Sequence, residues 1–134
     1  MAAWLPLRNA GAVVSHESAL ELHELSDVIP DAVHLSLPRS GRGQRRRAGV
    51  RLHTLNRPPK KAEVREIAGL PVTSPERSIV DALEAGAQPE QIEMAVRQAL
   101  DRGLTTPRRL RAAVATRPAR VRKLIERRLD RVPA

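Results

Sequence analysis

The chain has 134 residues, a formal net charge of +9, no cysteine and a single aromatic residue among Phe, Tyr and Trp. This length fits one domain, and the lack of cysteine excludes disulfide scaffolds, thiolate metal sites and cysteine nucleophiles. A surface of stacked aromatic side chains for single-stranded nucleic acid is excluded as well. Any contact with nucleic acid therefore has to use charges or hydrogen bonds.

The first half of the chain predicts two helices followed by two strands. A short helix is expected over residues 2–9, and Ser15 is expected to cap a second helix that carries HESALELHEL. Residues 33–38 and 49–55 alternate apolar and polar side chains, as half-buried strands do. We expect these strands to pair antiparallel around a glycine-containing loop, with the side chains of His34, Ser36, Arg51 and His53 on one polar face.

The second half predicts a short hairpin and then helices only. Residues 64–72 are expected to turn at Ala68 and Gly69, and Thr73 with Glu76 resembles a capping box for a helix ending near Gly86. Further helices are expected over residues 89–103, after the Thr-Thr-Pro at 105–107, and over 118–131. The fold class is therefore α+β: a small antiparallel β-sheet with an N-terminal helix and a C-terminal cluster of three to four helices.

Catalytic and metal-binding patterns are weak in this sequence. His16 and His23 are too far apart for a compact helical metal site, while His34 and His53 could share a metal across paired strands but have no evident third ligand. We therefore expect surface or boundary histidines. Asp81 and Glu84 are expected on a solvated helix face. A metal-dependent nuclease would need an acid pair with a lysine close behind it, and no lysine of this sequence follows an acid at that spacing. We expect no enzymatic activity and no cofactor.

The positive charge is concentrated in two segments. Residues 39–61 contain nine basic and no acidic residues, and residues 103–134 contain ten basic and two acidic residues, whereas the remaining segments are acidic. Such patches are typical of phosphate-binding surfaces. The candidate nucleic-acid-binding residues are Arg42, Arg45, Arg46, Arg47, Arg108, Arg109, Arg120, Lys123 and Arg127.

Five segments in order resemble a known family. They are SHESALELHEL, DVIPDAVHLSLPR, GVRLHTL, GLPVTSPERSIVDAL and IEMAVRQALDRGLTTPRRL, and together they are similar to the C-terminal domain of AbiEi-type antitoxins of type IV toxin-antitoxin systems. The resemblance covers roughly residues 4–131. The sequence departs from the family at Glu24, where the family tends to have Gly.

The resemblance implies a transcriptional regulator that opposes a nucleotidyltransferase-like toxin. The family usually adds an N-terminal winged helix that binds DNA, and this sequence begins where the C-terminal domain begins. We therefore expect residues 1–134 to be a single antitoxin-like domain without the winged helix, either a fragment or a stand-alone protein. Its own DNA contacts would be made to phosphates, with little sequence specificity.

Two alternatives from other functional classes remain open. The basic patches could instead dock on an acidic protein partner, or, less in keeping with the residues, the chain could be a metal-dependent nuclease. The longest apolar stretch is far shorter than the roughly 20 residues that span a bilayer, and the N-terminus lacks the pattern of a signal peptide. We therefore expect a cytoplasmic protein without a membrane partner.

Overall fold

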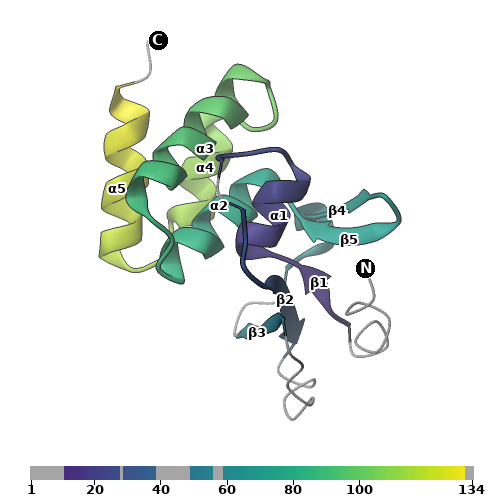
Figure 1. Cartoon of the computed structure of the whole chain (residues 1–134). Coiled ribbons are helices and arrows are strands. Elements are labelled where there is room, and N and C mark those ends of the chain that lie inside the picture. Colours follow the sequence, from purple (N-terminus) through teal and green to yellow (C-terminus); the bar gives the residue numbers. More distant parts are fainter. Residues whose placement is uncertain (1–10, 28, 39–48, 56–58, 132–134) are drawn as a thin grey trace.

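The computed structural model describes residues 11–27, 29–38, 49–55 and 59–131, and it shows a mixed sheet beside a cluster of helices (Figure 1). The expected helix over residues 2–9 lies outside this range. Along the chain the elements are β1 (Val13–Val14), α1 (His16–Leu22), β2 (Val33–Pro38), β3 (Val50–Leu55), the 3-10 helix η3 (Lys61–Glu63), β4 (Val64–Ile67), β5 (Leu70–Thr73), α2 (Pro75–Glu84), α3 (Pro89–Asp101), α4 (Pro107–Val114) and α5 (Ala119–Asp130).

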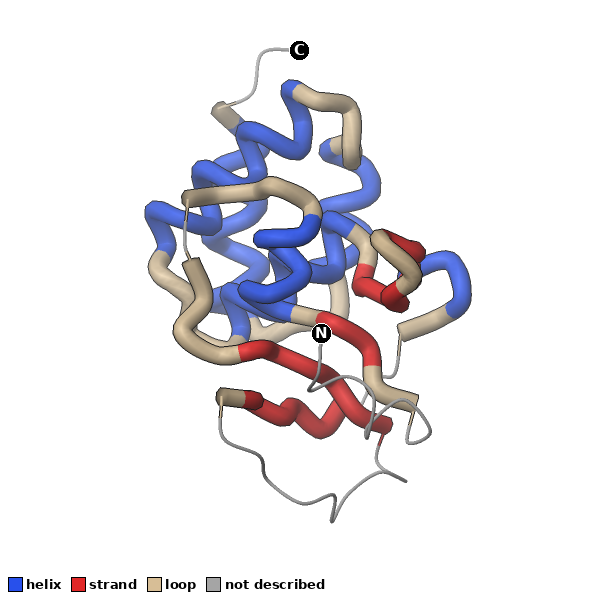
Figure 2. The backbone as a smooth tube through the Cα atoms, turned by 45° about the vertical axis from the view of Figure 1, so that its right-hand side comes forward, coloured by secondary structure: helices blue, strands red, loops and turns tan. Residues whose placement is uncertain are grey.

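The predicted α+β class is confirmed. An N-terminal helix and a sheet come first in the chain, and α2 to α5 then gather into one group, which Figure 2 shows in blue next to the red strands. In the described part of the chain, no helix is both long enough and apolar enough to cross a membrane.

The sheet is mixed, with the strand order β3-β2-β1-β5-β4. The predicted antiparallel pairing of residues 33–38 with 49–55 is wrong: β2 and β3 run parallel, with Val33 opposite Val50 and Pro38 opposite Leu55. Alternation with period two tells which side chains share a face, and it is the same for both strand directions. The two strands that flank the arginine-rich segment therefore do not form a hairpin.

The second predicted turn is confirmed. β4 and β5 pair antiparallel, with Ile67 opposite Leu70, and the two residues between them, Ala68 and Gly69, have φ angles of 52° and 78°. Two consecutive residues with positive φ are the hallmark of a tight two-residue hairpin whose twist matches its strands.

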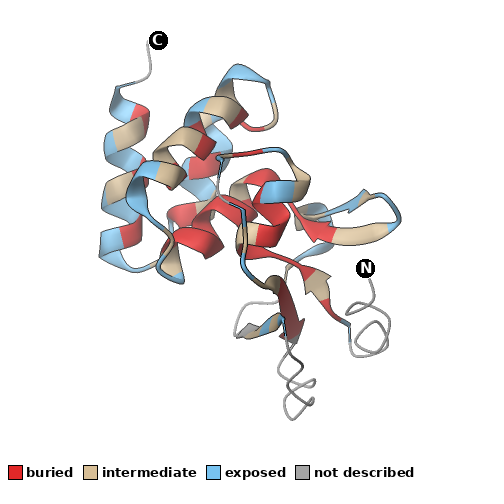
Figure 3. Cartoon of the chain, in the orientation of Figure 1, coloured by how far each residue is buried: buried red, intermediate tan, exposed pale blue. Residues whose placement is uncertain are grey.

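Two apolar cores meet at α1, most of which is buried in Figure 3. Ala19 of α1 packs in the core of the sheet with Leu35 of β2 and Val72 of β5. Leu20, the next residue, packs in the core of the helical cluster. The apolar residues that recur at the helical period in the last three helices belong to this second core, and they include Ile92, Val96, Ala99, Leu110, Val114, Val121, Ile125 and Leu129.

Two of the predicted helix caps differ from the structure. The cap of α2 is Ser74, whose hydroxyl accepts a hydrogen bond from the Arg77 N–H at 3.3 Å, while Thr73 is the last residue of β5. Ser15 holds the N-cap position of α1 but makes no capping bond with its side chain. Its hydroxyl is used instead in a buried polar cluster, which is described below.

Three helices end with the same backbone motif. After α1, the Leu25 N–H donates to the Leu20 carbonyl at 2.8 Å and the Glu24 N–H to the Glu21 carbonyl at 2.9 Å. The same pair of bonds closes α2 and α3, where the residue with positive φ is Gly86 or Gly103. At the end of α1 that residue is Glu24, with a φ of 58°. Its side chain therefore imposes a conformational cost that glycine avoids.

Replacing Glu24 with Gly is expected to raise the free energy of unfolding by about 1 kcal/mol, because a left-handed conformation costs a residue with a Cβ about that much. The motif itself does not depend on the side chain, since Arg102 Nη1 donates to the backbone carbonyls of His23 and Glu24. Urea unfolding followed by circular dichroism measures the change. Glu21→Gly is the matched control, because the same replacement inside α1 should destabilise by about 1 kcal/mol. A lower free energy of unfolding in the Glu24→Gly variant would refute the interpretation that Glu24 has an unfavourable backbone conformation in this turn.

Candidate functional site

A buried network of charges links η3, α2 and the turn before α5. Asp81 of α2 lies at its centre, with Oδ2 3.1 Å from Nε of Arg77 and Oδ1 2.8 Å from Nη1 of Arg117. The Asp81 side chain is only 4% exposed. Nη1 of Arg117 also contacts Oε1 of Glu84 at 3.0 Å, and Nη1 of Arg77 lies 3.4 Å from Oε1 of Glu63. The prediction of a solvated Asp81 is therefore wrong.

This network neutralises two arginines that contribute to the basic composition. Burial by itself would lower the pKa of Arg117, but the charge of Asp81 and the hydrogen bonds to Asp81 and Glu84 outweigh it and raise that pKa above its ordinary value. Arg117 therefore stays charged and is committed to its carboxylates. A count of arginines along the sequence overstates the charge available to a ligand.

Three histidines stack between α1 and the two parallel strands. The rings of His16 and His53 lie 3.7 Å apart between centroids and 12° from parallel, and Nδ1 of His34 lies 3.0 Å from Nε2 of His53. The shared polar face predicted for His34 and His53 is therefore confirmed although their strands run parallel. The expectation of surface or boundary histidines is wrong for His16 and His34, which are 5% and 4% exposed.

Hydroxyl groups complete this cluster. The Ser36 hydroxyl donates to Ser15 Oγ at 2.6 Å, and Ser15 Oγ lies 2.7 Å from Nδ1 of His16. His16 also has a φ of 56°, which is uncommon for a residue that begins a helix. Because Ser15 is fully buried, its hydroxyl has a structural role in joining α1 to β2.

The stacked rings are held in their neutral form. Burial, together with the neighbouring rings of His53 and His34, lowers the pKa of His16 from 6.5 to about 2, and burial with His34 lowers the pKa of His53 to about 4. Burial lowers the pKa of His34 too. Within the described ranges, no group of three or more His, Asp or Glu side chains is placed to hold a metal ion. The predicted His34–His53 pair thus has no third ligand there.

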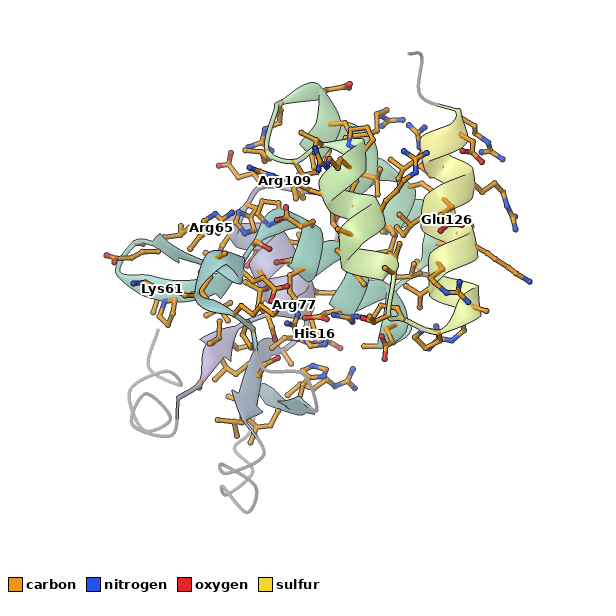
Figure 4. The ribbon with its side chains drawn as sticks, turned by 180° about the vertical axis from the view of Figure 1, so that it is seen from behind. His16, Lys61, Arg65, Arg77, Arg109 and Glu126 are labelled. Atoms are coloured by element: carbon orange, nitrogen blue, oxygen red, sulfur yellow. The ribbon has the colours of Figure 1, made fainter. Side chains whose placement is uncertain are left out.

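A pocket of about 710 Å³ lies between η3 with β4 on one side and α4 on the other. Its lining includes three exposed cations, Lys60, Arg65 and Arg109, together with the buried Arg77 and the partly buried Arg117 of the charge network. Figure 4 shows Arg65 and Arg109 near each other on this side of the molecule, with Arg77 deeper in the fold. The pocket thus brings together basic side chains that lie far apart in the sequence.

The predicted binding residues fall into three groups in the structure. Arg109 is exposed at the pocket, and Arg108 is its exposed neighbour on α4. Three others, Arg120, Lys123 and Arg127, are exposed on α5, opposite the buried stripe of that helix. The group Arg42, Arg45, Arg46 and Arg47 lies outside the described residues.

Two basic residues of the pocket were missing from the prediction. Lys60 lies in the strongly basic segment 39–61, so the charge count contained a signal for it. Arg65 lies in a locally acidic segment, and nothing in the sequence indicates that its strand faces α4.

The comparisons with known proteins support the fold and give no information on function. No family model and no curated protein matches this chain. The α+β arrangement is shared with the crystal structure of the RV2827C protein from Mycobacterium tuberculosis, at a TM-score of 0.63 and 21% sequence identity. The match covers 96% of this chain and 51% of the other, so this chain spans about half the length of that protein.

Proposed function

We propose that this chain is a non-enzymatic, antitoxin-like regulatory domain that contacts nucleic acid through its phosphates. The observation that carries the proposal is the outer face of α5, where Arg120, Lys123 and Arg127 are all exposed. Within the described residues, none of these three side chains forms an ion pair with a carboxylate. Cations without such partners are available to displace counterions from a nucleic-acid backbone.

The spacing of these three residues suits a phosphate-binding surface. They occur at positions i, i+3 and i+7 of one helix, so they follow one stripe, while Val121, Ile125 and Leu129 are buried on the opposite side. Arg120 is partly anchored, because its Nη2 donates to the Glu84 carbonyl at 2.8 Å. A row of exposed cations on a helix can neutralise phosphates, which are the same for every base sequence, and this supports binding with little sequence specificity.

Replacing both Lys123 and Arg127 with Ala is expected to weaken binding to duplex DNA and to reduce its salt dependence. If both residues contact phosphates, the slope of log K against log salt should fall by about 1.8, which is about 0.9 per contact. Fluorescence anisotropy of a labelled duplex in rising salt measures this slope. Lys61→Ala with Arg97→Ala removes the same charge from η3 and α3 and serves as the control. Absence of binding even at low salt would refute the nucleic-acid contact.

The regulatory role rests on the resemblance to AbiEi-type antitoxins and has a separate test. The chain is co-expressed with the product of the gene next to its own, and growth and co-purification are both scored. Rescue of growth without co-purification supports an antitoxin that opposes the toxin's effect. Stable co-purification through the α5 surface would instead support a module that docks on an acidic protein.

A further inference from the structure

The pocket between η3, β4 and α4 has features of a discrete site for an anion. Its exposed cations come from two parts of the chain: Lys60 and Arg65 flank η3, and Arg109 lies in the first turn of α4. In the described part of the chain, none of the three forms an ion pair with a carboxylate. A volume of about 710 Å³ is in the range of pockets that hold small ligands.

The guanidinium of Arg65 is held in place before any ligand binds. Its Nη1 donates to the carbonyl oxygens of Ala62 at 2.6 Å and Val64 at 3.3 Å. Among the residues that the structure describes, these bonds use one nitrogen of the guanidinium and leave the N–H groups of Nε and Nη2 for a ligand. A guanidinium fixed in this way loses less side-chain entropy on binding, and its planar donor pair suits the oxygens of a phosphate.

Most carboxylates near the pocket already have partners. Oε1 of Glu63 accepts from the Lys60 main-chain N–H at 2.9 Å and lies 3.4 Å from Nη1 of Arg77. Asp81 and Glu84 are bound by Arg117, as described above. Glu76 differs, because its Oε2 is buried and has no hydrogen-bond partner among the residues that the structure describes. The pocket therefore combines three exposed cations with one carboxylate oxygen that these residues leave without a partner.

We propose that this pocket binds one phosphate group, held by Lys60, Arg65 and Arg109, and that the group belongs to a nucleotide or a nucleic-acid strand. This inference rests on the proposed function. It makes that function more specific, because it names a binding site for one phosphate that is separate from the α5 surface. Charge-assisted bonds from two guanidinium groups and an ammonium favour a phosphate, which presents several anionic oxygens, over a singly charged carboxylate. Glu76 opposes the anion and weakens its binding.

The test uses the full chain and three probes: inorganic phosphate, adenosine 5′-monophosphate and a short DNA duplex. NMR spectra that detect the arginine Nε–H groups follow each titration. We expect saturable shifts at Arg65 and Arg109, and an affinity at least about tenfold lower in the Arg65→Ala/Arg109→Ala variant. Glu76→Gln should strengthen binding of all three probes, because it removes a negative charge from the pocket lining.

A control variant distinguishes binding at this pocket from nonspecific attraction of anions to a basic protein. Lys61→Ala/Arg97→Ala loses the same charge outside the pocket and should bind phosphate as the unmodified chain does. Shifts that do not saturate, or that are equal in both double variants, would show an adventitious ion only and overturn the proposal. Weaker binding in Glu76→Gln would overturn it too, because it would indicate a cationic or hydrogen-bond-donating ligand.

The same titrations distinguish the phosphate sources and the two proposals. Displacement of bound phosphate by the duplex identifies a nucleic-acid strand as the source, whereas displacement by the mononucleotide alone identifies a free nucleotide. Salt-dependent binding of DNA with no saturable phosphate site would overturn only the pocket. A phosphate site without any DNA binding would overturn only the proposed function.

Discussion

Replacing Asp81 with Asn is expected to lower the free energy of unfolding by about 3 kcal/mol, the lower end of the range measured when one partner of a buried ion pair is removed. Asp81 is the carboxylate between Arg77 and Arg117, whose side chains are only 5% and 8% exposed. The substitution keeps the shape of the side chain but removes their shared counterion, and it leaves Arg77 with Glu63 and Arg117 with Glu84, two carboxylates that are partly exposed. Because small domains are stable by only about 5–15 kcal/mol, the variant should unfold at a much lower urea concentration.

Asp130→Asn provides a matched control for this prediction. Asp130 pairs with Arg111 at 3.5 Å, and both side chains are largely exposed, at 75% and 49%. Loss of such a surface pair changes stability by less than about 1 kcal/mol. Urea unfolding of the two variants, followed by circular dichroism, compares a buried with an exposed pair. A cost for Asp81→Asn as small as that for Asp130→Asn would show that the network is not needed for folding.

Lowering the pH from 7.5 to 5 is expected to destabilise the fold through the stacked histidines. The folded-state pKa values of His16 and His53 lie below 6.5, at about 2 and about 4, so between pH 6.5 and 4 the unfolded chain binds more protons than the folded one. Their contribution is complete above pH 6.5 and is lost as the pH falls. Each fully shifted ring removes up to about 1.4 kcal/mol per pH unit, or about 2 kcal/mol by pH 5, and the partly exposed His53 removes less.

Burial is the largest cause of these pKa shifts, and several charges that face the cluster modify them. Arg77 and Arg117 lower the pKa of His16, and Arg51 lowers that of His53 and His34, whereas Glu17 and Asp31 raise that of His34. Urea unfolding at intervals between pH 7.5 and 5 measures the slope, and this range stays above the ordinary pKa of carboxyl groups. His53→Gln should flatten the slope, because it removes one shifted group and a ring that stacks on His16. An equal slope in that variant would contradict this origin.

The sequence predicted the helical half of the molecule because its helices follow local rules. In α3 and α5, apolar residues recur at the helical period, and the same residues, such as Ile92 and Ile125, are buried in the structure. Thr106 caps α4 as its Thr-Pro pattern indicated. The β4–β5 hairpin was also predictable, because the turn lies within four consecutive residues. In each case the residues whose pattern predicts the element are the same short stretch of residues that forms it.

Local patterns in the sequence were thus enough to predict the α+β class, the positions of the last helices, the hairpin turn at Ala68 and Gly69, and the shared face of His34 and His53. The parallel direction of β2 and β3, the burial of Asp81 between two arginines, and the pocket lined by Lys60, Arg65 and Arg109 became visible in the folded chain alone. This difference arises because period and capping depend on neighbours along the chain. Strand direction, the counterion of a buried charge and the walls of a pocket depend on residues that only folding brings together.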